Sequence, residues 1–190
     1  MSDVLSALRA SRPHRADAAR NFDALLAAAR EVFSAYGADA PLEDVAKQAG
    51  VSIATLYRNF STREQLLETV YISEVESVCR WAEEVDQLGP WEGITSWLCR
   101  FVEYVGTKRA VAVGISHDSE VFQACCDALS VAGGPLLKRA QAAGVMRSDV
   151  DTDDVMHFAI AYTLGNFSSA AQRDRMLNVA FDGLAVRPAY

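Results

Sequence analysis

The stretch that decides the fold is residues 41–60, PLEDVAKQAGVSIATLYRNF. Its apolar spacing predicts one short helix from Pro41 to Gly50 and a second that starts at the capping residue Ser52. Helices of about eight residues are unstable alone, so they must pack across one another and onto a third helix. Gly50 tolerates the positive φ of the turn, and Ala46 allows the close crossing. The stretch therefore predicts a helix-turn-helix.

Apolar residues at helical spacing continue on both sides of this stretch. Upstream they predict a helix from Asp17 to Tyr36, with Gly37 as its stop signal. Downstream, Ser61 and Glu64 form a capping-box pattern that opens a long helix; we expect the Ser61 side chain to accept from the Glu64 amide. Later helices are expected near 91–108, 116–131, 135–143, 152–168 and 172–186, about nine in total, and Thr152 is the expected cap of one of them.

The second helix of the helix-turn-helix presents a face suited to the major groove of DNA. Leu56 is expected to point inward with its apolar neighbours, Phe60 to pack in the core, and Tyr57 to face outward. Arg58 can pair with a phosphate or, bidentately, with guanine. The start of the next helix is a candidate phosphate contact. The DNA-binding candidates are Lys47, Ser52, Ile53, Ala54, Thr55, Tyr57, Arg58, Thr62 and Arg63.

Composition indicates a soluble globular protein. The 190 residues are 51% hydrophobic and 23% charged, and no apolar run approaches the roughly 20 residues of a membrane helix. Residues 1–20 carry scattered arginines and no apolar segment, so we expect no signal peptide and a cytoplasmic location.

The net charge of −7 is unusual for a DNA-binding protein, but it is unevenly distributed. Residues 1–70 hold eight Lys and Arg against nine Asp and Glu, whereas residues 71–190 hold ten against sixteen. The acidic total leaves two alternatives to DNA binding: a helical protein–protein interaction scaffold without DNA binding, and a small helical enzyme. A catalytic group of residues is not apparent, and we expect no enzyme.

Metal and redox chemistry have little support in the sequence. The histidines His117 and His157 lack partners at ligand spacing, so we expect no metal site and no cofactor. The cysteines show no CxxC spacing and are interpreted as small buried hydrophobes, with a redox sensor as the alternative. These cysteines are Cys79, Cys99, Cys125 and Cys126.

Several motifs at fixed spacing resemble the DNA-binding domain of the TetR family. The resemblance covers residues 15–71 and lies in AAREVF at 28–33, YG at 36–37, VAKQAGVS at 45–52, TLYRNF at 55–60 and REQLL at 63–67. Asn59 stands where the family often has His, and Ala40 stands where a hydroxyl cap is common. The segment 139–149 resembles a linker found in one large subset of the family.

The resemblance implies an all-α regulator: an N-terminal three-helix helix-turn-helix domain joined to a C-terminal helical bundle. We expect a flexible basic arm (1–15), a DNA-binding domain (16–62) and a ligand-binding and dimerisation domain (63–190). The implied partners are double-stranded DNA as a palindromic operator, a small-molecule effector and a second copy of the chain.

The effector pocket and the dimer interface are the least specified parts. Small residues in the last two helices, such as Ala159 and Gly165, favour a four-helix interface between two copies. Aromatic and polar residues of the second domain either line a pocket or form ordinary core. The pocket candidates are Trp81, Trp97, Phe101, Tyr104, His117, Phe122, Met146, His157, Phe158, Tyr162 and Asn166.

Overall fold

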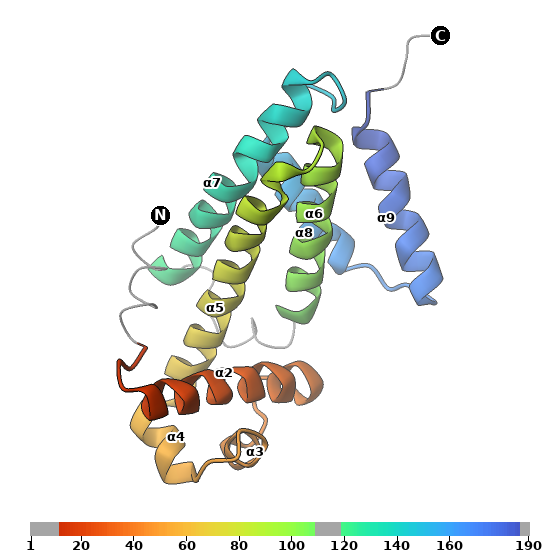
Figure 1. Ribbon diagram of the computed structural model, residues 1–190. Coiled ribbons are helices and arrows are strands. Elements are labelled where there is room, and N and C mark those ends of the chain that lie inside the picture. The colour runs from red at the N-terminus through yellow and green to blue at the C-terminus, as the bar shows by residue number, and fades with distance from the viewer. Residues whose placement is uncertain (1–11, 109–118, 187–190) are drawn as a thin grey trace. The chain divides into compact units, whose positions relative to one another are not determined.

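The computed structural model describes residues 12–108 and 119–186 and confirms the predicted all-α class (Figure 1). Eight α-helices lie within these residues, close to the expected nine. The chain divides into two compact units, Met1–Ser77 with Thr107–Ala128, and Val78–Gly106 with Leu129–Tyr190. Within the described ranges, every helix is too short or too polar to cross a lipid bilayer.

The first unit holds the helix-turn-helix. Its helices are α2 (Ala16–Tyr36), α3 (Leu42–Gln48), α4 (Ile53–Asn59) and the beginning of α5 (Arg63–Glu84). They share one apolar core that includes Phe22, Leu25, Phe33, Val45, Leu56, Phe60 and Leu66, all buried. The short helices α3 and α4 are therefore stabilised by packing in this shared core, because helices of this length are unstable alone. Tyr36 ends α2, and Gly37 follows at a φ of 89°.

The start of α5 differs from the predicted capping box by one residue. Thr62 Oγ1 accepts a hydrogen bond from the Gln65 amide at 3.1 Å, so Thr62 and not Ser61 is the cap. The Gln65 side chain, rather than that of Glu64, reaches back and accepts from the Ser61 amide at 2.8 Å. In a capping box the returning side chain would bond to the amide of the cap itself, so this start of α5 has only one of the two reciprocal bonds.

Arg63 ties the start of α5 to the connection between α2 and α3. Its Nη1 donates to the carbonyl oxygens of Ala38 at 2.8 Å and Ala40 at 2.6 Å. Ala40, which stands where a hydroxyl cap is common in the family, is buried. The α2–α3 connection is therefore fixed by a guanidinium from α5 instead of by a local hydroxyl.

The second unit is a helical bundle around a buried aromatic row. It contains the end of α5, the short 3₁₀ helix η1 (Val85–Gln87), and α6 (Pro90–Lys108) up to Gly106. On α6, Trp97 and Phe101 are stacked with ring centroids 5.6 Å apart, and the ring centroids of Phe101 and Tyr104 are 6.1 Å apart. The Trp97 indole N–H donates to the Val78 carbonyl at 3.2 Å.

Helix α7 (Glu120–Ala142) corrects the prediction of two separate helices near 116–131 and 135–143. Pro135 lies inside it and leaves the carbonyl of Val131, an exposed residue, without its helical donor. Gly133, two residues before the proline, is where α7 packs most closely on Trp97. A Cβ at Gly133 would lie 2.3 Å from Cη2 of Trp97, so the indole ring occupies the space that a side chain would need.

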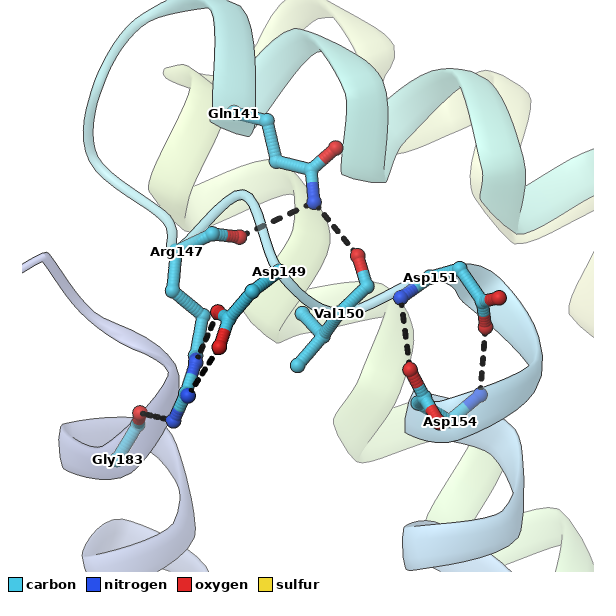
Figure 2. A network of polar contacts seen from close by, with 7 residues as sticks. All are labelled: Gln141, Arg147, Asp149, Val150, Asp151, Asp154 and Gly183. Atoms are coloured by element: carbon cyan, nitrogen blue, oxygen red, sulfur yellow. Dashed lines mark hydrogen bonds and ion pairs between the residues drawn. The ribbon is translucent and has the colours of Figure 1, made fainter.

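The turn between α7 and α8 (Thr152–Thr163) is joined to the end of α9 (Ala170–Leu184). The Arg147 amide donates to the Leu184 carbonyl at 2.9 Å, and the Val186 amide donates to the Val145 carbonyl at 3.1 Å. Figure 2 shows Arg147 also bonded to both carboxylate oxygens of Asp149 and to the Gly183 carbonyl. The ion pair lowers the pKa of Asp149 to about 2.

The ends of α8 also differ from prediction. Asp151, not Thr152, is the cap: its side chain accepts from the Asp154 amide at 2.9 Å, and Asp154 accepts from the Asp151 amide at 3.0 Å (Figure 2). The helix ends at Thr163, before the predicted residue 168, and Ser169 caps α9.

Replacement of Arg63 by alanine should destabilise the first unit. The Ala38 and Ala40 carbonyls would lose a charged donor, so we expect Arg63→Ala to lower the free energy of unfolding by about 1–3 kcal/mol. The control is Arg58→Ala, because Arg58 is exposed and bonded only within its own helix; its effect should stay within about 0.5 kcal/mol. Urea titrations at one protein concentration measure both. Equal stabilities would contradict the anchoring role.

The neighbouring glycines of α7 provide a matched test of the Trp97 contact. Gly133→Ala places a methyl group against a buried indole and should cost about 1–3 kcal/mol of stability. At Gly134 the nearest atom to a new Cβ is Thr152 Oγ1 at 3.6 Å, an ordinary contact, so Gly134→Ala should change stability by less than about 1 kcal/mol. Thermal unfolding followed by circular dichroism compares the two. The packing explanation fails if both variants melt alike.

Candidate nucleic-acid interface

The α3–α4 turn sets the direction of the candidate recognition helix, α4. The Val51 amide donates to the Ala46 carbonyl at 3.0 Å, and the Gly50 amide donates to the Lys47 carbonyl at 3.1 Å. Gly50 has a φ of 69°, which a residue with a side chain rarely adopts. This pair of bonds is the Schellman pattern, which ends a helix and turns the chain sharply.

Helix α4 is anchored through two residues. Leu56 is its one buried residue, and Phe60, just beyond its end, is buried with its ring centroid 5.1 Å from that of Phe22. Ser52 caps the helix by accepting from the Thr55 amide at 3.2 Å. The remaining side chains are exposed or partly exposed, which is the arrangement that a groove-binding helix needs.

The predicted DNA-binding residues gather on α4 and beside it. Ser52, Ala54, Tyr57 and Arg58 are exposed, and Ile53 and Thr55 are partly buried. The side chain of Tyr57 is 50% exposed, as expected for an outward hydroxyl. Lys47 is exposed on α3 and Thr62 at the start of α5. Arg63 differs from the others, because its guanidinium is partly buried and bonded to the α2–α3 connection.

Polar side chains on α4 bond to one another. Arg58 Nη2 donates to Thr55 Oγ1 at 3.0 Å, and Thr55 Oγ1 lies 2.9 Å from Ser52 Oγ. Asn59, where the family often has His, donates from Nδ2 to the Thr55 carbonyl at 2.8 Å. Sequence reasoning identified Thr55 and Arg58 separately but missed the bond between them.

Charge pairing distinguishes the arginines of this unit. Arg12 forms two hydrogen bonds to Asp23, which lower the pKa of that carboxyl group, and Arg20 and Arg30 pair with Asp17 and Glu74. Lys47 and Arg58, by contrast, form no ion pair with any residue in the described ranges. Lys47 and Arg58 are therefore exposed cations on α3 and α4 that no carboxylate of the described residues neutralises.

The candidate effector residues come from both units of the chain. Met146 is buried in the second unit with the aromatic row of α6, and Phe122 belongs to the first unit, where its ring is 6.3 Å from that of Tyr71. Trp81 is partly buried, and its indole N–H is buried without a hydrogen-bond partner. His117 lies outside the described residues.

The other candidates lie on α8 or after it. His157 and Phe158 are exposed, and His157 Nδ1 lies 2.9 Å from the Asp153 carbonyl. Tyr162 donates to the Arg173 carbonyl, and partial burial raises its pKa. Asn166 is exposed. Of these four candidates, only Tyr162 is partly buried in a single chain.

The cysteines and acidic residues give little sign of other chemistry. Burial, reinforced by Glu103, raises the pKa of Cys99, which disfavours the reactive thiolate. Across residues 12–108 and 119–186, no three His, Cys, Asp or Glu side chains are grouped as metal ligands would be.

Comparisons with known proteins agree on one family. Residues 25–70 match the model of the tetR family of bacterial regulatory proteins, and residues 89–186 match that of the C-terminal domain of SbtR-like transcriptional regulators. No curated protein sequence matches the chain.

Two solved structures cover nearly the whole chain. A TetR transcriptional regulator from Streptomyces coelicolor is 34% identical with a TM-score of 0.76, over 88% of this chain and 99% of that one. A TetR regulator from Mycobacterium vanbaalenii is 28% identical with a TM-score of 0.74, over 92% and 100%. The chain therefore belongs to the TetR family of bacterial transcriptional regulators.

Proposed function

We propose that the protein is a repressor that binds a palindromic operator as a homodimer and leaves it when a small-molecule effector binds. The observation that carries the proposal is α4: a short, capped helix with its apolar residue in the core and hydroxyl and guanidinium groups exposed. Hydrogen-bond donors of this kind match the acceptors of phosphates and of base edges in the major groove.

Release from DNA requires a connection between the effector-binding part and α4. Three residues separate the end of α4 from the start of α5, which continues over about 33 Å, at 1.5 Å per residue, into the second unit. We infer that the domain of residues 16–62 contacts DNA and that residues 63–190 bind the effector and the second copy. A tilt of α5 that moved the two α4 helices of a dimer by a few Å would change the distance between them. They would then no longer match two half-sites that are 34–36 Å apart on the DNA.

We place the dimer interface on α8 and α9, the last two helices. None of the residues of α9, all of which the structure describes, is buried in the single chain. Apolar side chains are exposed along both elements and the loop between them: Phe158, Ile160, Leu164, Met176 and Val179. A second copy placed on this surface would bury them and form the four-helix arrangement that joins many helical dimers.

The role in transcription suggests two further assignments. A regulator acts where the DNA is, so we propose a cytoplasmic location. We also propose that the chain is not an enzyme, because the family to which it belongs consists of regulators.

Tyrosine variants test the DNA-binding face. Tyr57→Phe removes a hydroxyl that we expect to donate to a phosphate, and should weaken operator binding at least about 10-fold. The matched control is Tyr36→Phe at the end of α2, where the side chain is 77% exposed; its affinity should be unchanged. Fluorescence anisotropy with an operator duplex selected from random DNA gives both affinities.

The same assay separates DNA binding from the scaffold alternative. Operator affinity should fall steeply as salt concentration rises, because bound phosphates release counterions. Equal affinities for the two tyrosine variants would contradict the assigned face, and the absence of salt-dependent DNA binding would favour a protein-binding scaffold.

Valine variants test the dimer interface. Val179→Asp puts a charge on the proposed α8–α9 surface and should convert the dimer to a monomer in analytical ultracentrifugation at micromolar concentration. Val131→Asp is the control, since Val131 on α7 is 71% exposed against 61% for Val179 and lies outside that surface. If both variants remain dimeric, or both dissociate, α8 and α9 do not form the interface as proposed.

A further inference from the structure

Three side chains on α4 form a continuous chain of hydrogen bonds. Arg58 Nη2 donates to Thr55 Oγ1, which is bonded to Ser52 Oγ, which in turn accepts from the Thr55 amide. The residues stand three apart, so each is one turn from the next along one side of the helix. The guanidinium is thereby held back toward the start of α4 instead of extending from its end.

The chain of bonds leaves mainly donors for an outside partner. A hydroxyl group has one proton and two lone pairs. Thr55 Oγ1 uses one lone pair for Arg58, and the bond to Ser52 uses the proton of one of the two hydroxyls. Whichever hydroxyl donates, the other keeps its proton free, and Arg58 keeps its remaining N–H groups. The outward surface therefore favours a partner rich in acceptors.

We propose, on the basis of the proposed function, that Thr55 is a positioning residue that holds Arg58 to recognise a guanine in each operator half-site. In the major groove, guanine presents two adjacent acceptors, N7 and O6, which match the fork of a guanidinium. Adenine and thymine each present one acceptor beside a donor or a methyl group, and cytosine presents a donor. The N-terminal residues of a recognition helix are those that reach base edges, and Thr55 holds Arg58 toward them.

The bond between Arg58 and Thr55 favours a base over a phosphate as the partner. Arg58 has no carboxylate partner within the described residues, so its fork is not neutralised. Its bond to Thr55 fixes the orientation of the fork, which matters for two parallel bonds to a base and much less for attraction to a phosphate. Ordering the side chain before binding should improve affinity about 3- to 10-fold.

The experiment selects binding sites from random duplex DNA with the full-length protein and then measures affinity for all four bases at each position. We expect a half-site with one guanine that the wild type prefers by about 10-fold or more. Arg58→Ala and Arg58→Lys should both abolish this preference, because lysine keeps the charge but lacks the fork.

Substitutions of Thr55 test the positioning role. Thr55→Val keeps the shape of the side chain and removes the acceptor, so it should reduce the guanine preference about 3- to 10-fold. Thr55→Ser keeps the hydroxyl group and should keep the guanine preference of the wild type. In an Arg58→Ala background, Thr55→Val should not change base preference further. Thermal unfolding of each variant shows that the fold is retained.

Other outcomes overturn the proposal. If Arg58→Ala weakens binding equally for all four bases, Arg58 contacts a phosphate. If Thr55→Val keeps the full guanine preference, Thr55 does not position Arg58. If the wild type selects no sequence at all, the proposed function fails and this inference fails with it.

Discussion

The backbone of Gly50 determines how the DNA-binding part is built. Its left-handed conformation allows the Val51 amide to reach the Ala46 carbonyl, and these bonds fix the direction in which the chain leaves α3. Once that direction is set, Leu56 lies in the core, and the hydroxyls and guanidinium of α4 are exposed. A helix of seven residues could not keep this orientation by its own stability.

An acidic protein can still present positive charge to DNA if its cations are unevenly neutralised. The net charge of −7 is an average over the chain, and much of the basic charge near α2 is paired with carboxylates, as in Arg12 with Asp23. Lys47 on α3 and Arg58 on α4, by contrast, form no ion pair with a carboxylate of the described residues. The local pattern of ion pairs therefore says more about the proposed DNA-binding face than the total charge does.

The sequence predicts best what local chemistry determines. Gly37 and Gly50 mark where α2 and α3 end, and Ser52 marks where α4 begins. The outward position of Tyr57 follows from helical spacing. Contacts between distant residues could not be predicted: the indole of Trp97 lies against Gly133 in α7, and this helix continues through Pro135, where the sequence indicates a break. The direction of Arg63 likewise depends on carbonyl groups more than twenty residues away.

Helix α9 buries none of its residues fully in an isolated chain, and apolar residues such as Leu177 and Phe181 are only partly buried. Its attachment at one end comes from backbone bonds between 145–147 and 184–186. If a second copy supplies the missing burial, assembly and folding are linked by mass action, and the melting temperature rises with protein concentration. Dilution in the cell would then lower the amount of folded regulator as well as the occupancy of its operator.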